Sequence, residues 1–373
     1  MADSLTVLHI DTERTWRGGE QQMCYLALGL KAVGHSAPVV CRPGSECETR
    51  AASFGLDVHP VAVRGDVALV AAHRLARLID RLGVDIVHAH TSRAHLAAVL
   101  AKRFSRRKPL CVVHRRVDFS IHKLPCRISG LKYRWGVDRY IAITQAVKSV
   151  MVADGIPSDQ IDIIHSSTDL SRFEGIERQP GLRTELGIPE DALLVGNVAA
   201  LVGHKGQAFL LDAAAQVLKQ CPKAFFLILG EGELRSDLEA QAESLGISDR
   251  IRMPGFRSDV PQCMAELDVF CMSSWGEGMG SVVLEAMAMR RPIVVTDAGG
   301  LVEVITNQKD GLVVPARDAD ALAKAMVQLL THSSLAHRLA EAARQTVETR
   351  FSKESMVEHT LALYKRLLSA TTS

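Results

Sequence analysis

The sequence predicts an α/β protein made of two consecutive doubly wound domains. Short apolar runs of strand type alternate with helical patterns along the chain, which is typical of βαβ units with parallel sheets. The 373 residues exceed what one hydrophobic core usually holds. The low aromatic content, 5%, favours an α/β protein over a β-sandwich. The polar stretch 174–180 interrupts the alternation with one glycine and one proline. We therefore predict a first domain over residues 1–173 and a second over 174–352.

Apolar runs rich in Val, Ile and Leu are predicted to form the strands, as expected where helices cover both faces of a sheet. In the first domain they cover residues 5–10, 37–41, 84–90, 110–114, 138–143 and 160–165. Helical patterns occur there at 19–33, 66–82 and 94–104. In the second domain the strand-like runs cover 193–199, 225–230, 250–255, 268–272, 292–297 and 311–315. Further helical patterns close the chain.

Composition favours a soluble protein of the cytoplasm. The eight cysteines are spread along the chain without a CxxC pair, so we expect free thiols and a reducing compartment. The first residues lack the basic and apolar regions of a signal peptide. No apolar run approaches the roughly 18–20 residues that span a bilayer. We therefore expect a protein that is neither secreted nor membrane-spanning.

The charge of the chain is uneven. The net charge is +2, yet the segment 102–139 holds twelve Lys or Arg against two acids, a balance of +10 that leaves −8 elsewhere. Such a segment can be a solvated face, but its clustering favours an anionic partner. Tyr133 and Trp135 among the cations favour an anionic membrane surface or an anionic glycan. No nucleic-acid-binding motif is present, so no nucleic acid is expected.

The segment 273–300 is the most informative part of the chain. A strand-like run ends there in a glycine-rich loop that opens a helix near Ser281, and α/β proteins build anion sites in this way. Glu277 and Glu285 flank the glycines. Because a carboxylate repels a phosphate, these two side chains suit the vicinal hydroxyls of a ribose or a hexose. The alternative interpretation is a solvated turn and an exposed helix position.

EGMGSVVLEAMA, in which seven residues separate Glu277 from Glu285, resembles the E-x7-E signature of the retaining glycosyltransferase family four, on the GT-B fold. Other segments resemble motifs of the same family: GGEQQ (18–22), HSSTDLSRF (165–173), HKG (204–206), PGF (254–256) and GG-x-x-E (299–303). The resemblance implies two Rossmann-like domains that face a cleft, with the acceptor on the first and the donor on the second. It also implies that the helix over 353–373 crosses back onto the first domain.

The resemblance implies a role for each matching residue. Glu277 would accept from hydroxyls of the donor hexose, Glu285 from those of the ribose, and Lys205 would neutralise the diphosphate. Other donor-binding positions would be Gly18, Gly19, Gly203, Phe256, Arg257, Gly278, Met279, Gly280 and Ser281. The nucleotide sugar is a substrate, and neither a cofactor nor a metal ion is expected.

The acceptor side is expected around His114, which maps to a family histidine near the donor sugar and the acceptor. A structural hydrogen bond is the alternative role for this side chain. Basic residues assigned to the acceptor or membrane side are Arg103, Arg106, Arg107, Lys108, Arg115 and Arg116. In one departure from the family, Ala200 stands where an arginine is usual, five residues before Lys205. Either His204 or an arginine elsewhere would replace that cation, or the donor phosphate is bound differently.

Three further patterns resemble binding motifs but do not predict a site. His88 and His90 share one side of a strand, but no third ligand is identifiable, so no metal site is expected. The pair Asp318 and Asp320 resembles the metal-binding DxD of other glycosyltransferases, yet its place before a helical pattern favours N-capping. The sequence Gly-Glu-Gly at 230–232 lacks the third glycine of a dinucleotide fingerprint.

The sequence therefore predicts a retaining, metal-independent hexosyltransferase. It would transfer a hexose-type sugar from a nucleotide-diphosphate sugar to a glycan or lipid-linked acceptor, in the biosynthesis of cell-envelope polysaccharide or lipopolysaccharide. We expect it in the cytoplasm, where it could also dock peripherally on the inner face of the membrane. Two alternatives stay open: an epimerase or phosphorylase of the same architecture, and a non-catalytic nucleotide-sugar-binding protein.

Overall fold

The computed structural model describes residues 4–63, 68–117, 120, 135–179 and 181–371. The chain divides into two compact units, one of residues Met1–Ser167 with Lys353–Ser373 and one of Thr168–Ser352. The sequence placed the boundary at 173/174. In the structure Thr168 belongs to the second unit because its N–H donates to Phe351 O at 2.8 Å and it pairs with Ser352.

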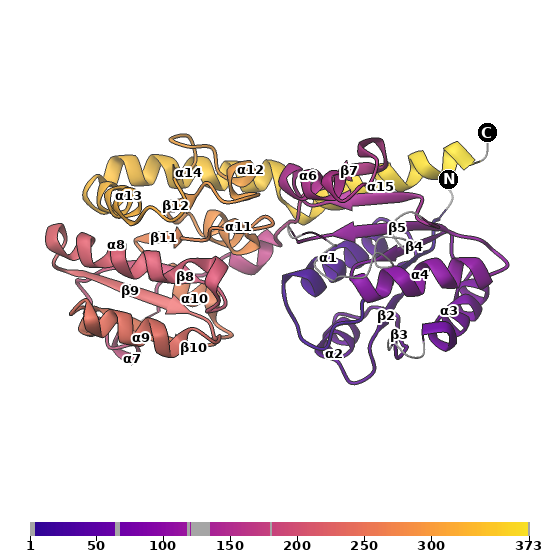
Figure 1. The fold of residues 1–373 in the computed structure, drawn as a ribbon, viewed down its shortest axis with the longest axis horizontal. Helices are drawn as coiled ribbons and strands as arrows, with labels where there is room; N and C mark the ends of the chain where they lie inside the picture. Colours follow the sequence, from indigo (N-terminus) through magenta and orange to yellow (C-terminus); the bar gives the residue numbers. More distant parts are fainter. Residues whose placement is uncertain (1–3, 64–67, 118–119, 121–134, 180, 372–373) are drawn as a thin grey trace. The chain divides into compact units, whose positions relative to one another are not determined.

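The first unit contains a seven-stranded sheet in the order β3-β2-β1-β4-β5-β6-β7, and its strand pairs are parallel (Figure 1). The strands are β1 Val7–Ile10, β2 Val39–Cys41, β3 Val58–Pro60, β4 Ile86–Ala89, β5 Leu110–Arg115, β6 Arg139–Ala142 and β7 Ile161–Ile163. Six of them follow the predicted runs. The edge strand β3 was not predicted, because it has only three residues, none of them fully buried.

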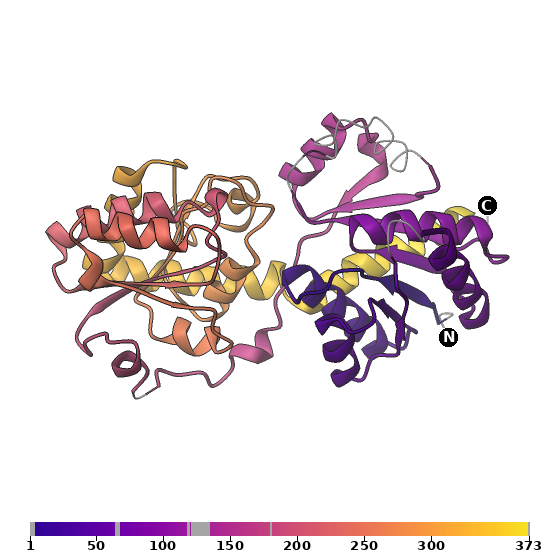
Figure 2. The same ribbon diagram turned by 60° about the horizontal axis from the view of Figure 1, so that its bottom comes forward.

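Helices pack on this sheet, and one of them comes from the end of the chain. They are α1 Gly18–Ala32, α2 Glu46–Ser53, α3 Ala68–Leu82, α4 Ser92–Phe104, α6 Gln145–Ala153 and α15 Lys353–Thr371. Helix α15, yellow in Figures 1 and 2, lies against α1. A side chain at Gly29 of α1 would come within 2.2 Å of Val357, so the glycine permits this close packing. Tyr364 of α15 is fully buried in the core of the unit.

The second unit contains a six-stranded parallel sheet in the order β10-β9-β8-β11-β12-β13. Its strands are β8 Leu193–Val198, β9 Ala224–Leu229, β10 Ile251–Gly255, β11 Val269–Met272, β12 Ile293–Thr296 and β13 Leu312–Val314. Its helices are α7 Leu182–Glu185, α8 Gln207–Gln220, α9 Arg235–Ser244, α10 Val260–Ala265, α11 Ser281–Ala288, α12 Leu301–Val304, α13 Ala319–Thr331 and α14 Ser333–Arg350. The two sheets make the protein an α/β protein of two Rossmann-like units, as predicted.

Strand order determines where each unit can bind a ligand. The first three strands of each sheet extend in one direction from β1 or β8, and the later strands extend in the other direction from β4 or β11. In open parallel sheets, ligands bind outside the carboxyl ends of the strands at this switch point. The candidate sites are therefore the loops after β1 and β4 in the first unit and after β8 and β11 in the second.

Asp318 and Asp320 have structural roles in the second unit. Asp318 caps α13, and its carboxylate accepts from the Ala321 N–H at 2.9 Å, so the predicted N-cap is confirmed. Asp320 instead accepts from Gln216 at 2.6 Å. Among the described residues, the helices are all too short or too polar to cross a bilayer.

Candidate active site

In the second unit, the loops after β8 and β11 are bound tightly to each other. The backbone N–H of Trp275 donates to His204 O at 2.9 Å, and its indole N–H donates to Gly203 O at 2.8 Å. The Ser273 hydroxyl donates to Lys205 O at 3.0 Å. These bonds hold HKG (204–206) against the start of the glycine-rich loop, two segments that the sequence analysis assigned to the donor.

An ion pair lies at the centre of these loops. Lys205 Nζ donates to Glu277 Oε2 at 2.5 Å, and both side chains are largely buried, with exposed fractions of 17% and 11%. Ser274 Oγ lies 3.3 Å from the same carboxylate oxygen. A cation and a carboxylate that meet at a switch point can together receive a ligand with both phosphates and hydroxyls. Two residues that the sequence singled out separately therefore form one site.

Two glycines make this loop geometry possible. Gly206 has a φ of 67°, and a side chain there would lie 2.1 Å from Ser273 O. Gly299 has a φ of 52°, and a side chain there would lie 2.1 Å from Glu277 O. Both combine a left-handed backbone with a close approach to another backbone, which only glycine allows. Replacement of either would push the Glu277 loop out of place.

Helix α11 presents its amino terminus in the same region. Its N-cap is Gly280, which provides no side-chain cap, so the first N–H groups of the helix are left for a ligand. Glu285 lies in the second turn. Burial raises the pKa of its carboxyl group, while Arg172, 3.9 Å away, acts in the opposite direction. The helix therefore offers N–H donors suited to an anion and a carboxylate suited to hydroxyls.

Of the two residues predicted to border the base, Phe256 and Arg257, only the first is free to contact it. Phe256, directly after β10, is 77% exposed and can stack on a base. The Arg257 guanidinium, in contrast, pairs with Glu185 and Asp259, each at 2.6 Å, and these bonds raise its pKa. One pair near the ion pair was not predicted: the Arg317 guanidinium lies 4.3 Å from the centre of the Trp275 ring. Arg317 follows β13 and Trp275 follows β11, so no single stretch of the sequence could indicate this pair.

In the first unit, four histidines meet at the carboxyl ends of β1, β4 and β5. His114 stacks on His88 with ring centres 5.4 Å apart, and His9 Nδ1 lies 3.1 Å from His90 Nε2. His88 Nδ1 lies 2.6 Å from the buried Tyr364 hydroxyl. Burial lowers the pKa of all four imidazoles, and that of His9 falls to about 3. The cluster is therefore neutral at physiological pH.

The structure supplies the third histidine that the sequence did not find. His9 pairs with His88 in the parallel register of β1 and β4, and His9, His88 and His90 offer nitrogen atoms within 4.8 Å of one another. Both ring nitrogens of His90 are hydrogen-bonded, however, one to His9 and one to Arg116 at 3.2 Å. A metal ion there would lie beside the positive charge of Arg116. The geometry therefore favours a hydrogen-bonded network at these three histidines over a metal centre.

A cavity of about 470 Å³ lies at this switch point of the first unit. Its lining includes four residues that the sequence assigned to the donor or the acceptor: Gly19, His114, Arg115 and Arg116. Gly18 begins α1 beside it. The cavity thus brings together the glycine-rich loop and the predicted acceptor residues.

In the structure, the basic residues assigned to the acceptor or membrane side divide into two groups. Arg115 and Arg116 lie at the carboxyl end of β5, whereas Arg103, Arg106, Arg107 and Lys108 precede its amino end. The two groups therefore lie at opposite edges of the sheet, because β5 runs from one edge to the other. Arg107 also pairs with Asp85 at 3.2 Å. Arg115 and Arg116 can therefore contact a ligand in the cavity, whereas the residues before the amino end of β5 cannot.

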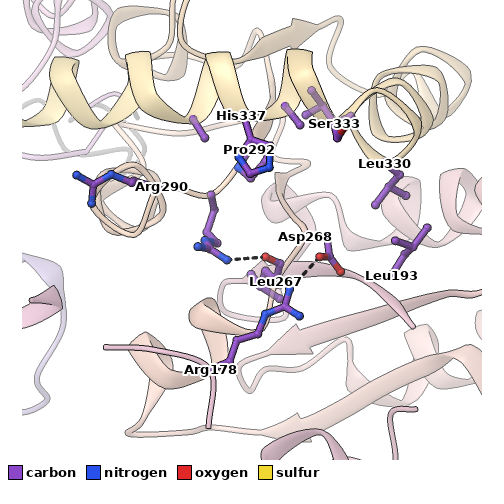
Figure 3. A pocket seen from close by; sticks show the side chains of 13 residues that line it. Arg178, Leu193, Leu267, Asp268, Arg290, Pro292, Leu330, Ser333 and His337 are labelled. Carbon is purple, nitrogen blue, oxygen red and sulfur yellow. Dashed lines mark hydrogen bonds and ion pairs between the residues drawn. The ribbon is translucent and has the colours of Figure 1, made fainter. Parts of the chain in front are cut away.

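A second cavity, of about 360 Å³, is in the second unit, at the edge of the sheet opposite its switch point (Figure 3). It lies before the amino ends of β8, β11 and β12, away from Lys205 and Glu277. Arg178 in its wall pairs with Asp268 at 3.0 Å, as Figure 3 shows. We therefore take the carboxyl ends of the strands as the candidate active site.

The fold and its two loop clusters define a GT-B protein, and comparisons with known proteins agree. Residues 16–172 match the model of Glycosyltransferase Family 4, and residues 179–346 match that of glycosyl transferases group 1. The chain belongs to glycosyltransferase family 4. This rests also on the EpsD protein of Bacillus subtilis, whose name places it among the glycosyltransferases. EpsD is 30% identical to this chain over 315 residues, 82% of each chain.

Two further similarities extend over nearly the whole chain. The lipopolysaccharide core biosynthesis glycosyltransferase LpsE of Rhizobium meliloti is 29% identical over 346 residues, which are 93% of this chain and 95% of LpsE. The crystal structure of Anabaena HepE in complex with UDP superposes with a TM-score of 0.85 at 20% identity, over 97% of this chain and all of HepE. At that identity, HepE supports the fold alone.

Proposed function

We propose that the protein is a retaining hexosyltransferase that uses a nucleotide-diphosphate sugar. It would transfer the sugar to a glycan or lipid-linked acceptor in cell-envelope polysaccharide or lipopolysaccharide biosynthesis. The ion pair of Lys205 and Glu277 beside the amino terminus of α11 carries the proposal. The name of LpsE supports the lipopolysaccharide assignment, and the UDP bound to HepE makes uridine diphosphate sugars the first donors to test.

Each group of the site would have a distinct task. Lys205 and the N–H groups of α11 would stabilise the negative charge that develops on the departing diphosphate. Glu277 would accept from hydroxyls of the hexose and Glu285 from those of the ribose. Lys205 and the helix terminus take over the role that a metal ion plays in other glycosyltransferases, so we propose metal-independent transfer. His114, neutral and buried, would contact the acceptor by a hydrogen bond.

We also propose that the first unit docks on an anionic membrane surface, where a lipid-linked acceptor would be found. Arg103, Arg106 and Lys108 are exposed at the amino edge of the sheet, and the exposed Phe104 lies among them. Each basic residue near an anionic surface contributes on the order of 1 kcal/mol.

A panel of nucleotide sugars, read first by thermal shift and then by product formation, tests the function. A donor at a hundred times its dissociation constant adds about 2.7 kcal/mol of stability. Glu285→Gln should reduce the shift, and Glu243→Gln, at an exposed position of α9, is the matched control that should keep it. The proposal fails if no nucleotide sugar shifts the wild-type protein. Conversion of a donor without any acceptor would instead indicate an epimerase.

A further inference from the structure

The cavity of the first unit is lined by a half-buried cation, Arg116, that has no ion-pair partner within hydrogen-bond distance among the described residues. Arg116 lines it, and Nη2 of its guanidinium lies 3.2 Å from His90 Nδ1 and 3.4 Å from His114 Nδ1. The Nε and Nη1 atoms of Arg116 are shielded from solvent and find no hydrogen-bond partner among the described residues. Within the described part of the chain, this guanidinium therefore donates only to neutral imidazoles, and its remaining donors are unpaired there.

The same contacts determine the tautomer of His114. Arginine only donates, so Nδ1 of His90 and Nδ1 of His114 must both accept, and each neutral ring carries its proton on Nε2. His90 uses this proton, because its Nε2 lies 3.1 Å from His9 Nδ1. His114 does not: its Nε2 is buried and has no partner within the described part of the chain. His114 therefore adds a third unused donor to the two of Arg116.

The nearest acids only partly balance this charge. Burial, and secondly the charge of Glu20, raise the pKa of Asp11 to about 8. Glu13 and Glu20 line the cavity, and the Glu20 carboxylate already accepts from the Arg17 N–H at 2.7 Å. Arg116 itself stays charged, although burial lowers its pKa to about 10. Three arginines, Arg17, Arg115 and Arg116, line the cavity against these two glutamates, so its wall has an excess of positive charge.

Helix α1 points its amino terminus at this cavity. Its second residue, Gly19, lines the wall, and a side chain there would lie 3.7 Å from Arg116 Cδ. The 15-residue helix adds the positive end of its dipole to the guanidinium and the imidazole N–H. Three kinds of donor therefore converge, and buried donors of this kind are normally satisfied.

We propose that this cavity binds an anionic group of the acceptor, a phosphate or a carboxylate, through Arg116 and His114. The proposal rests on the proposed function and names the acceptor class more closely: the sugar is transferred to an acceptor that carries a negative charge near the reacting hydroxyl. The unpaired Nη1–H groups of Arg116 can donate to an oxyanion, and His114 Nε2–H can supply a further hydrogen bond.

Inorganic phosphate and UDP are the probes, with the full chain and 31P NMR titration. Phosphate is measured in a Lys205→Met background, so that the donor site does not contribute. There, Arg116→Gln should raise the phosphate dissociation constant at least tenfold. Arg116→Lys should give a smaller rise, because it keeps the charge but loses the planar guanidinium donors. Arg77→Gln, an exposed arginine of α3 in the same unit, is the control and should change nothing.

Two results would overturn the proposal. One is equal phosphate binding by Arg116→Gln and Arg77→Gln. The other is a loss of UDP binding in Arg116→Gln as large as that in Lys205→Met, since the anion would then belong to the donor. His114→Phe keeps the guanidinium and should weaken phosphate binding several-fold, which covers the case that Arg116→Gln does not fold. Failure of the wild type to bind UDP or transfer sugar would contradict the proposed function and leave phosphate binding at Arg116 as a separate result.

Discussion

Lys205 Nζ lies 2.5 Å from Glu277 Oε2, across 72 residues of sequence. This pair joins the loops after two neighbouring strands, and in the proposed reaction each partner contacts a different part of the donor. The lysine would move toward the diphosphate and the carboxylate toward the hexose. The pair therefore holds both side chains in place before the donor arrives, so that neither is buried without a partner.

The first prediction separates the two glutamates. Glu285→Ala should weaken binding of free nucleoside diphosphate by roughly 10- to 100-fold, as expected for loss of hydrogen bonds to a charged group worth about 1.5–3 kcal/mol. Glu277→Ala should leave this binding nearly unchanged, or tighten it because Lys205 is released, and should impair sugar transfer. Calorimetry with the free diphosphate decides. An equal loss in both variants would refute the division into ribose and hexose contacts.

The second prediction restores the cation that the family usually has. Ala200 is exposed, directly beyond β8, so Ala200→Arg meets no steric barrier. The added guanidinium should tighten nucleoside diphosphate binding by about tenfold, since a hydrogen bond to a charged group is worth about 1.5–3 kcal/mol. Ala200→Gln, which adds length without charge, is the control. An unchanged affinity would mean that another group of this protein already replaces the arginine.

The third prediction concerns metal ions. Sugar transfer should continue at an undiminished rate in excess EDTA, because Lys205 and the amino terminus of α11 supply the positive charge. Initial rates with and without chelator are compared. Loss of activity that Mg²⁺ or Mn²⁺ restores would show that the diphosphate needs a metal ion after all.

The fourth prediction follows from the buried histidines. Their pKa values are lowered in the folded state, so between pH 6.5 and the folded pKa the unfolded chain binds more protons. The free energy of unfolding should therefore fall as pH drops below 6.5, by up to about 1.4 kcal/mol per pH unit for each histidine. His9→Gln should reduce this slope, and His359→Gln, at an exposed position of α15, should not. Urea unfolding at pH 5 to 7.5 measures it, and identical slopes would contradict the assignment.

The fifth prediction tests membrane docking. The variant in which Arg103, Arg106, Arg107 and Lys108 become Ser should lose binding to anionic vesicles at low salt. Binding by the wild type should weaken as salt rises, because charges are screened beyond about 8–10 Å at physiological ionic strength. The control removes four exposed cations of the second unit: Lys219, Lys309, Lys324 and Arg338. Co-sedimentation in which the wild type stays in solution, or in which both variants behave alike, would exclude this docking surface.

Much of the fold could be predicted because its signals are local. Parallel strands covered on both faces are continuous apolar runs, and twelve such runs were found; β3, short and partly exposed, has no such pattern. Glu277, Glu285 and the intervening glycines could likewise be found together, because a loop and the helix that follows it are contiguous in sequence.

The sequence by itself determined the two parallel sheets and the residue types at the ends of their strands. Only the tertiary structure decided which of those residues meet. It paired Lys205 with Glu277, brought His9 to His88, and placed Arg116 apart from Arg106 at the other end of β5. The reason is physical: periodicity reports how a segment is buried, whereas contacts between distant segments depend on strand order and register, which no short stretch of sequence contains.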